Sequence, residues 1–452
     1  MAEEVNQNVT PFLLEELMNG DMMTFREIFF ELHTYEQGEF YLALSSEERQ
    51  QLYRYLSPKE LADLFDGIEE EQEDVEQLLK EMDSSYAADM LSYMFTDNAV
   101  DTLNQLDKKD VAMYLSIMEP ESAKEIKNLL HYEDDTAGSI MTTEYVAIAA
   151  DQTVKSAMAY LKEAAADAEI IYYIFVVDEA GYLVGVISLR DLIVNDDQAL
   201  IRDVMSERVI SVKVGDDQED VANTMRDYDF LAVPVTDYKN RMLGIVTVDD
   251  IIDVIDEEAA SDYSGLAGVD VEEVAENPLH AAKKRLPWLI TLLFLGMSTA
   301  TLIGHYEALV SEASILAVFI SLITGTAGNA GTQSLAVAVR RLAMQEDDRS
   351  FIRLIFSELV TGIITGLITG LTIMVIVGVW KHNFTLGFVI GMAMLCAITV
   401  ANLAGSLIPM LMDKLGFDPA VASGPFITTL SDLTSVLIYF SIASLFMSYF
   451  IG

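Results

Sequence analysis

The chain has 452 residues, of which 52% are hydrophobic and 22% are charged, and its formal net charge at pH 7 is −45. Residues up to Arg285 carry 63 acidic and 21 basic side chains, whereas the rest of the chain is nearly neutral. This excess of negative charge repels nucleic acid and attracts cations, so it excludes a nucleic-acid partner. The single cysteine, Cys396, excludes an intramolecular disulfide and a cysteine-based zinc site. The first 20 residues hold neither a basic nor an apolar stretch, and we expect no signal peptide.

Short amphipathic helices are predicted from about Val9 to Glu133, because apolar residues recur at intervals of three and four. Turn-and-cap signals such as Ser57-Pro58 and Glu119-Pro120 separate these helices. We therefore expect an acidic helical N-domain over residues 1–135, stacked as an irregular superhelical array. By itself such an array is typical of a scaffold.

Two segments between Met141 and Ile255 repeat each other. The positions in register are Gly185 with Gly244, Ser188 with Thr247, and Asp191 with Asp250. A strand, a glycine turn, a strand and a helix with a polar cap make one α/β unit, and two such units can pack as a pair. The pattern resembles a tandem CBS domain pair, and we expect it to fill residues 136–256.

CBS pairs are regulatory modules, and some of them bind adenine nucleotides through the Ser/Thr and Asp positions of the motif. The resemblance makes Ser188, Asp191 and Thr247 candidate ligands of a nucleotide such as ATP. A purely structural module and a cation sensor are the alternatives.

A dense acidic run, Asp249–Asp262, follows the second repeat. In a helix it places Asp250, Asp253 and Glu257 near one face, and like charges three and four residues apart destabilise a helix unless something neutralises them. Hard divalent cations would do so, because carboxylate oxygens and water are their preferred ligands. The alternative is a solvated acidic face. A connecting helix is expected over residues 257–285, leading into the membrane part.

The remainder, residues 286–452, predicts an all-α transmembrane domain, because each of its apolar segments is long enough to span about 30 Å of hydrocarbon. The five segments are Pro287–Leu309, Ser314–Val339, Phe351–Trp380, Leu386–Leu411 and Pro419–Ile451. Basic residues precede the first segment, lie between the second and third, and lie between the fourth and fifth. The positive-inside rule then places the N-terminus in the cytoplasm and the C-terminus outside a cell (plasma) membrane.

The last segment carries a carboxylate, Asp432, about halfway along its apolar length. Thr428, Ser435 and Tyr439 share its helical face, which makes a narrow polar stripe, and Gly424-Pro425 can break the helix before the stripe. An ionisable group at membrane depth is costly unless it faces water, an ion or a partner. We expect Asp432 to line an ion path, and a carboxylate bonded to a neighbouring helix is the alternative.

The second membrane segment contains the small and polar run GTAGNAGTQS, Gly325–Ser334, which is poor lipid-facing material. A pore wall beside Asp432 would use Gly325, Gly328, Asn329 and Thr332 together with Thr428 of the last segment. An interhelical polar contact is the alternative. In the third segment, Gly362, Gly366 and Gly370 form a GxxxGxxxG face, which predicts close helix packing.

These features together resemble the MgtE family of magnesium channels, most specifically in the membrane motifs GNAGTQS and DPAVASGPFITTLSD. The resemblance covers essentially the whole chain. It implies a homodimer with a pore on the two-fold axis, so that Asp432 occurs twice around one ion. It also implies cytosolic Mg²⁺ sites that close the channel, with the connecting helix acting as a plug.

The positions that match the regulatory sites of the family are distributed over four parts of the chain. They are Asp97, Asp101 and Gly138 in or after the N-domain, Glu219, Asp229, Asp250 and Asp253 in the CBS pair, Glu258 and Asp262 in the connecting helix, and Asp418 at the mouth of the last segment. Ser261 stands where a second carboxylate is expected before Asp262, which weakens that match.

Magnesium fits Asp432 because Mg²⁺ prefers oxygen ligands and dehydrates reluctantly, and no His or Cys cluster accompanies this carboxylate. A cation-coupled secondary transporter is a second hypothesis, although the segments show no inverted repeat. A membrane-anchored nucleotide sensor is a third. The sequence shows no Walker A motif and no nucleophile–histidine spacing, so we expect no enzyme activity.

Overall fold

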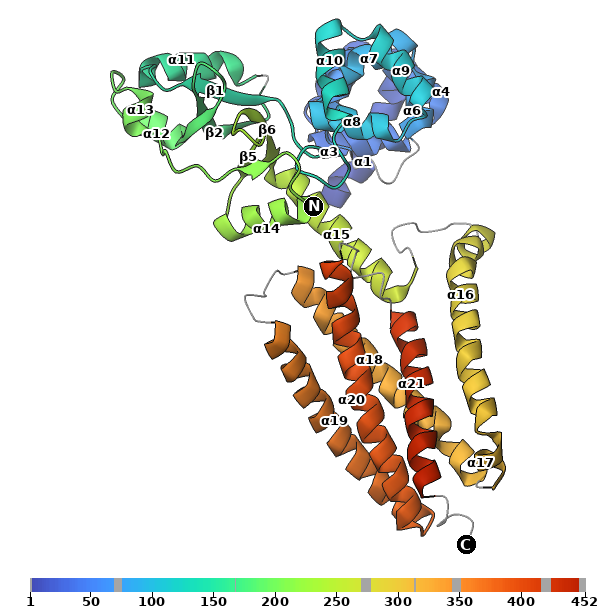
Figure 1. The fold of residues 1–452 in the computed structure, drawn as a ribbon. Coiled ribbons are helices and arrows are strands. Elements are labelled where there is room, and N and C mark those ends of the chain that lie inside the picture. The colour runs from blue at the N-terminus through green and yellow to red at the C-terminus, as the bar shows by residue number, and fades with distance from the viewer. Residues whose placement is uncertain are drawn as a thin grey trace. The chain divides into compact units, whose positions relative to one another are not determined.

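The computed structural model describes residues 2–68, 75–166, 168–269, 278–312, 314–343, 351–415 and 424–446. The chain forms two compact units, Met1–Val254 and Ile255–Gly452, and each has its own hydrophobic core (Figure 1). Helix α15 (Val248–Ala267) belongs to both, because it carries the chain from the first unit into the second.

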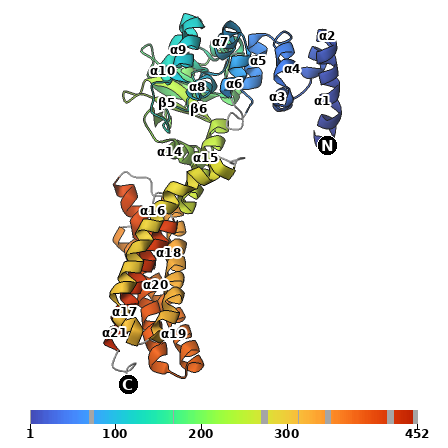
Figure 2. The ribbon, with the colours of Figure 1, turned by 90° about the vertical axis from the view of Figure 1, so that its right-hand side faces the viewer.

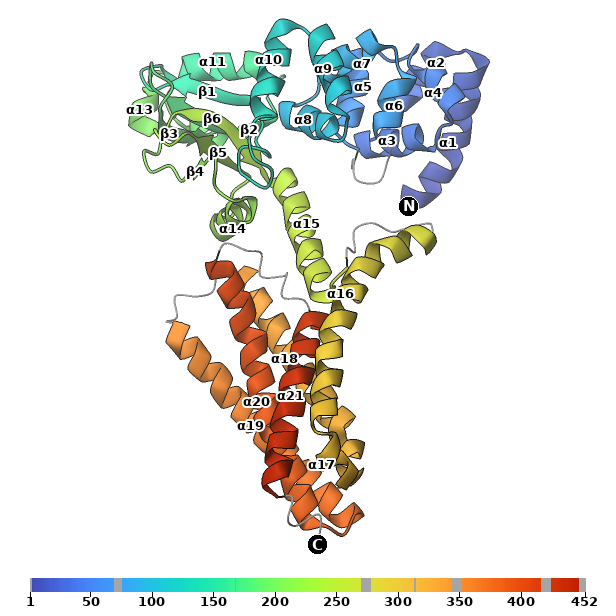
Figure 3. The ribbon, with the colours of Figure 1, turned by 45° about the vertical axis from the view of Figure 1, so that its right-hand side comes forward.

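Short helices build the beginning of the first unit. Those in the described residues are α1 (Ala2–Asn19), α2 (Met22–Phe29), α3 (Thr34–Ala43), α4 (Ser46–Leu52), α5 (Pro58–Phe65), α6 (Val75–Glu81), α7 (Ser84–Leu91), α8 (Thr96–Asn104), α9 (Lys108–Ile117) and α10 (Pro120–Leu129). Figure 3 shows them as a curved array of successive short helices. The helical N-domain expected from the sequence is confirmed.

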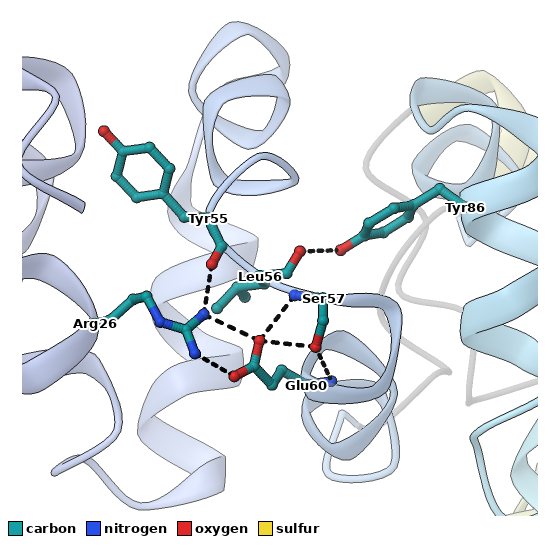
Figure 4. A network of polar contacts seen from close by, with 6 residues as sticks. All are labelled: Arg26, Tyr55, Leu56, Ser57, Glu60 and Tyr86. Carbon is teal, nitrogen blue, oxygen red and sulfur yellow. Dashed lines mark hydrogen bonds and ion pairs between the residues drawn. The ribbon is translucent and has the colours of Figure 1, made fainter. Parts of the chain in front are cut away.

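One polar network illustrates how these helices are joined (Figure 4). The Arg26 guanidinium on α2 donates to the Tyr55 carbonyl oxygen at 2.6 Å and forms an ion pair with Glu60 on α5. Glu60 also accepts from the Ser57 amide at 2.8 Å, which completes the capping box that starts α5. The Tyr86 hydroxyl on α7 donates to the Leu56 carbonyl oxygen at 2.9 Å. Three non-adjacent helices therefore meet at one turn of the chain.

The two predicted repeats follow, and each holds a three-stranded sheet. The first contains β1 (Tyr145–Ala149), α11 (Val154–Ala164), β2 (Ile170–Val177), β3 (Leu183–Ser188), α12 (Leu189–Val194) and α13 (Ile201–Val204), and the second contains β4 (Val212–Lys213), α14 (Gln218–Tyr228), β5 (Ala232–Thr236), β6 (Met242–Thr247) and the start of α15. In each sheet the first two strands pair parallel and the last two pair antiparallel. The internal duplication and the α/β class are confirmed.

Each repeat packs on the segment that opens the other one. A Cβ atom added at Gly185 would lie 2.4 Å from the sulfur of Met205, and one added at Gly244 would lie 2.4 Å from the Thr142 carbonyl oxygen and 3.0 Å from the sulfur of Met141. A side chain at Gly244 would collide with backbone, whereas one at Gly185 would displace the Met205 side chain. The matched glycines in the sequence are thus explained by a reciprocal contact that holds the repeats together.

The helical array and the second repeat share one hydrophobic core. Buried side chains of α9 and α10, such as Tyr114 and Ile126, belong to the same cluster as Val221 of α14, Val233 of β5 and Ile251 of α15. The first unit is therefore one packed body in which α8 to α10 lie against the second repeat.

The second unit is built from long apolar helices. Its described elements after α15 are α16 (Pro278–His305), α17 (Glu307–Glu312), the 3₁₀ helix η2 (Ser314–Phe319), α18 (Ile320–Ala343), α19 (Phe351–Trp380), α20 (Phe384–Lys414) and α21 (Gly424–Leu445). Five helical stretches in the described residues are long and apolar enough to cross a membrane, as expected. Figure 2 shows the long helices of this unit running roughly along one direction.

Small residues set the closest helix contacts of this unit. Cβ atoms added at Gly362 and Gly366 would lie 3.0 Å from the Thr399 Cα atom and 2.8 Å from the Leu395 carbonyl oxygen, and one at Gly370 would lie 2.5 Å from the Gly391 carbonyl oxygen. The GxxxGxxxG face is therefore the contact of α19 with α20, and its packing interpretation is confirmed.

The connecting helix differs from its expected limits. It begins at Val248, because Thr247 and Asp250 form a helix-starting pair of hydrogen bonds, and no glycine or proline interrupts the acidic run until Gly265. It ends at Ala267, next to Gly268 with a φ of 67°. The expected single helix to residue 285 is therefore wrong, since a separate helix, α16, starts at Pro278.

Candidate metal centre

Three carboxylates from distant parts of the sequence converge in the first unit. Asp97 lies in the first turn of α8, Glu169 immediately precedes β2, and Asp250 lies in the first turn of α15. One carboxylate oxygen of each lies within 4.8 Å of the other two. Asp97 is buried and the other two are half-buried. We call Asp97, Glu169 and Asp250 the acidic triad.

Backbone structure fixes each member of the triad. The Thr247 hydroxyl donates to Oδ2 of Asp250 at 2.5 Å, and the Glu169 amide donates to the Glu144 carbonyl oxygen at 3.0 Å. The Asn98 amide donates to Oδ1 of Asp97 at 2.9 Å. Within the described residues, Oε2 of Glu169 is buried without any hydrogen-bond partner. A buried anionic oxygen without a donor calls for a cation or a proton.

The electrostatics of the triad point the same way. Burial raises the pKa of Asp97 well above its usual range, and the charges of Asp250 and Glu169 raise it further. Burial and the charge of Asp250 likewise raise the pKa of Glu169, and burial raises that of Asp250. Three ionised carboxylates so close together repel one another, so the cluster must hold protons or a cation at neutral pH.

Two further acids, Asp101 and Asp66, lie on α8 or bond to its start. Asp101, one turn along α8, is exposed, and its charge adds to the raised pKa of Asp250. Asp66 accepts from the Phe95 amide at 3.2 Å and from the Asn98 side-chain amide at 3.1 Å, and its burial raises its pKa to about 6. The first turn of α8 is thus held by side chains outside the helix.

A hard divalent cation fits this donor set. Carboxylate oxygens are the ligands that Mg²⁺ and Ca²⁺ prefer, and the triad offers no His or Cys nitrogen or sulfur. Opposite ligands of an octahedral Mg²⁺ lie roughly 4.2 Å apart, because each metal–oxygen bond is about 2.1 Å. The three oxygens lie within 4.8 Å of one another, which is close to this spacing, so one ion could contact them directly or through water.

The structure thus brings together Asp97 and Asp250 of the predicted regulatory set, and Asp101 lies near enough for its charge to act on Asp250. Glu219 and Asp229 lie at the two ends of α14, where Asp229 is the exposed left-handed residue after the helix. Asp253, Glu258 and Asp262 lie further along α15, Gly138 packs against Tyr132 and Val214, and Asp418 lies outside the described residues. Glu169 is the member of the cluster that sequence reasoning missed.

The candidate nucleotide residues are helix caps in both repeats. The Ser188 hydroxyl donates to Oδ2 of Asp191 at 2.6 Å, and the Asp191 amide donates back to the Ser188 hydroxyl at 3.1 Å. Thr247 makes the equivalent bond to Asp250. The Ser/Thr–Asp motif therefore has a structural role at the start of α12 and α15, and in the second repeat it also positions a triad carboxylate.

The membrane carboxylate Asp432 lies half-buried on α21 and makes no hydrogen bond or ion pair with any described residue. A Cβ atom added at Gly328 of α18 would lie 3.0 Å from the Thr428 methyl group, so α18 passes directly beside α21 one turn before Asp432. Thr332 donates to the Asn329 carbonyl oxygen of its own helix at 3.0 Å. The small and polar run thus packs against the part of α21 that precedes Asp432.

One polar face of α18, here called the open face, is not covered by the rest of the described chain. Gly325, Asn329 and Gln333 recur every four residues along the helix, and all three are exposed in the single chain. Polar side chains at membrane depth are costly in contact with lipid. This face is therefore suited to water or to a second protein surface.

The residues of the polar stripe predicted on α21 do not share one environment. Ser435 and Tyr439 are fully buried, and the Tyr439 hydroxyl donates to the Leu316 carbonyl oxygen of η2 at 2.9 Å. This half of the stripe is therefore part of the helix packing, because the tyrosine supplies a donor to the irregular backbone before α18.

Comparison with known proteins agrees with this architecture. Residues 32–135 match the MgtE intracellular N domain, residues 137–195 and 201–257 match the CBS domain, and residues 320–442 match MgtE, a divalent cation transporter family. The chain is 75% identical over 440 residues to the magnesium transporter MgtE of Enterococcus faecalis, with 97% of both chains covered.

Two solved structures are similar to a little more than half of the chain. The soluble part of a magnesium transporter is 65% identical with a TM-score of 0.56, and it covers 56% of this chain and 100% of its own. The cytosolic domain of the Mg²⁺ channel MgtE in complex with ATP is 38% identical with a TM-score of 0.50, and it covers 54% of this chain and 99% of its own.

Proposed function

Because the chain belongs to the MgtE family of magnesium transporters, we propose that it is a channel that conducts Mg²⁺ down its electrochemical gradient and closes when cytosolic Mg²⁺ binds. The chain is a multi-pass membrane protein of a transporter family. We place it in the cell membrane with its N-terminus in the cytoplasm and its C-terminus outside, since basic residues flank the spans on that side.

The acidic triad is the observation that supports closure by cytosolic Mg²⁺. Asp97 comes from the helical array, whereas Glu169 and Asp250 come from the two CBS repeats. Without a cation, repulsion among the three carboxylates opposes docking of α8 on the repeats. A bound Mg²⁺ attracts all three carboxylates and therefore favours docking. An ion can shift the equilibrium between docked and undocked α8 only if it binds the docked state more tightly. The triad provides this difference in affinity, because its three ligands meet only when α8 is docked.

Helix α15 supplies the route from this site to the membrane part. It begins with Asp250, and within the second unit its end packs through Leu266 against Leu335 of α18 and Ile427 of α21. The Leu266 carbonyl oxygen would lie 2.9 Å from a Cβ atom at Gly424, the first residue of α21. Movement of α15 would therefore act on α21, which carries Asp432, and on α18 beside it. Asp253, Glu258 and Asp262 on α15, together with Asp418, Glu219 and Asp229, are the further acids proposed to bind regulatory Mg²⁺.

Conduction is assigned to Asp432 and to the open face of α18. We propose a homodimer in which two copies of this face, with Gly325 and Asn329, enclose a hydrated path, while Gly328 and Thr332 lie on the side of α18 that packs against α21. An unpartnered carboxylate from each copy would then hold a hydrated Mg²⁺ without stripping its water. A dimer also explains how polar residues at membrane depth avoid lipid.

A nucleotide is the second ligand we propose. A 38% identical cytosolic domain was solved with ATP, and Ser188, Asp191 and Thr247 occupy the motif positions in the two repeats of this chain. Because Thr247 also orients Asp250, a nucleotide bound there would alter the triad. The expected result is a change in the Mg²⁺ concentration for half-closure when ATP is added.

Single-channel recording from reconstituted protein, with Mg²⁺ varied on the cytosolic side, tests the proposal. We expect discrete current steps at low cytosolic Mg²⁺ and closure at millimolar levels. A flux without resolvable channel openings, coupled to another ion, would instead identify a secondary transporter. Currents that do not change with cytosolic Mg²⁺ would contradict the proposed closure by Mg²⁺ but not the proposed conduction.

A further inference from the structure

A second buried carboxylate lies in the membrane part, and it takes no part in the sites described above. Glu358 on α19 is only 8% exposed, although its neighbour Ser357 is exposed. A charged group at this depth is costly unless it is paired, and it is by default a functional candidate.

Glu358 is paired to side chains of two other helices. Its Oε2 atom accepts from the Asn402 side-chain amide of α20 at 3.0 Å and from the Ser334 hydroxyl of α18 at 3.2 Å. Its Oε1 atom accepts from the Arg341 guanidinium of α18 at 3.3 Å. The Ser334 hydroxyl also lies 2.7 Å from the hydroxyl of Ser406 on α20. One carboxylate therefore joins α18, α19 and α20.

This cluster is not suited to bind a cation. Arg341 already neutralises the carboxylate and would repel a second positive charge. The adjoining cavity, bounded by Arg341, Glu358 and Ser406, measures about 10 Å³, which is room for about one water molecule. The cluster is therefore a closed hydrogen-bond network, whose geometry is specific because a buried ion pair tolerates few arrangements.

The network lies on the same helix as the small and polar run. Ser334 is the last residue of that run, and Gly328 beside Thr428 lies six residues earlier, roughly 9 Å along the helix axis. Between them, a Cβ atom added at Gly405 of α20 would lie 2.2 Å from the Gly331 carbonyl oxygen. This contact turns Gly331 of α18 toward α20, and the bonds of Glu358 to Ser334 and Arg341 orient the turns of α18 that follow.

We propose that Glu358 is a positioning residue of the ion path. Its bonds to Ser334, Arg341 and Asn402 set the rotation of α18, and this rotation directs the face with Asn329 and Gln333 toward the path beside Asp432. The inference rests on the proposed function for the identity of the path. The rotation itself does not depend on which ion passes.

The test uses the full-length protein in liposomes and combines Mg²⁺ flux per folded molecule with a cysteine reporter. The reporter is Gln333→Cys in a Cys396→Ala background, modified by a hydrophilic thiol reagent. Glu358→Gln keeps the shape but leaves Arg341 without its counter-charge. We expect roughly tenfold lower flux per folded molecule and a changed rate of Gln333→Cys modification.

Arg341→Met added to Glu358→Gln removes the uncompensated charge and should restore both readouts toward wild type, since replacing both members of a buried pair is often tolerated. Ser357→Ala, on the exposed side of the same turn, is the matched control and should change neither readout. Should Glu358→Gln fail to fold, Ser334→Ala removes the bonds to Glu358 and Ser406 without leaving a charge behind. It should shift the same two readouts by a smaller factor.

Glu358→Gln or Ser334→Ala protein that folds with wild-type flux and wild-type reporter modification would overturn the proposal. So would a lower yield of folded protein with unchanged flux per molecule, because that result describes a purely structural role. If wild-type protein passed no Mg²⁺ while the reporter still responded to Glu358→Gln, the proposed function would fail and the positioning role would stand.

Discussion

The Glu144 carboxylate accepts hydrogen bonds from both the backbone amide and the hydroxyl of Thr96, the first residue of α8. It also accepts from the Thr142 hydroxyl at 2.6 Å and from the Thr143 amide at 3.0 Å. Phe95 occupies the N-cap position of α8 and has no side-chain group to cap it. The helix that carries Asp97 is therefore capped by the segment that opens the first CBS repeat.

Replacing Glu144 with Ala should loosen the start of α8. Loss of a cap costs about 1 kcal/mol, which corresponds to a roughly fivefold faster amide exchange of the first turn if it opens locally. Hydrogen exchange of full-length protein at saturating Mg²⁺ measures this directly. The matched control is Glu133→Ala, an exposed acid of the same connecting segment. Unchanged protection of α8 in Glu144→Ala would show that the cap contributes nothing.

The sequence predicts those parts of the fold that local rules determine. The two repeats are predicted from capping pairs and glycines in register. A helix cap and a close backbone approach each require particular residue types at positions only a few residues apart, so the sequence shows them directly. Asp432 stands out because a carboxylate in an apolar segment is rare. Asp250 stands out through the repeat register and the acidic run, whereas Asp97 follows only from the family resemblance.

Long-range contacts could not be predicted in the same way. Glu169 joins the triad only because the backbone before β2 bonds to Glu144 and because α8 docks beside it, and no pattern near Glu169 records this. Helical spacing put Tyr439 on the face of Asp432, but its hydroxyl is used by Leu316, 123 residues away. Spacing identifies a face of a helix and does not identify what covers it.

The Arg26–Glu60 pair should stabilise the beginning of the helical array. The hydrogen bond from Arg26 lowers the pKa of Glu60 to about 2, below its usual value of about 4.3, so this stability is present above pH 4.3 and is lost as pH falls toward 2. Glu60→Gln also removes the ion pair of α2 with α5. We expect a local loss of about 1–2 kcal/mol, measured by hydrogen exchange of residues 46–65. Glu47→Gln, an exposed acid of α4, should have no such effect, and equal protection in the two variants would contradict the prediction.

Neutralising the membrane carboxylate should abolish transport without unfolding the protein. Asp432→Asn keeps the shape but removes the charge that holds the hydrated ion, and we expect Mg²⁺ uptake into liposomes to fall by roughly tenfold or more. The control is Thr434→Val, because the Thr434 hydroxyl bonds only to carbonyl oxygens of its own helix. Near-wild-type uptake by folded Asp432→Asn protein would remove this residue from the path.

Glu169→Gln should weaken the response to cytosolic Mg²⁺. The change removes one of three anionic ligands at constant volume, and a loss of about 1.4 kcal/mol of binding raises the half-closing Mg²⁺ concentration tenfold. Channel recording over a Mg²⁺ series measures the shift, with Glu163→Gln on α11 as the exposed control. If the half-closing concentration stays the same, Glu169 is a neighbour of the site and not a ligand.

The raised pKa values of the triad predict an effect of pH that depends on the cation. Burial and neighbouring charge raise the pKa of Glu169 to about 8, and burial raises that of Asp250 to about 7, so the docked form binds protons more tightly than a form in which the carboxylates are solvated. Docking without divalent cations should therefore strengthen as pH falls from 8 to 6, and the gain is complete only near the ordinary values of about 4.

The measurement is hydrogen exchange of α8 in excess chelator at pH 6 and pH 8, corrected for the intrinsic rate of exchange. We expect greater protection at pH 6. Saturating Mg²⁺ should flatten the difference, because the ion replaces the protons and binds best to ionised carboxylates. The double variant Glu169→Gln with Asp250→Asn removes two of the three titrating groups and should lose most of the pH dependence. Greater protection at pH 8 in chelator would mean that these carboxylates do not repel one another in the docked form, and the triad would then lose its role as the element that senses Mg²⁺.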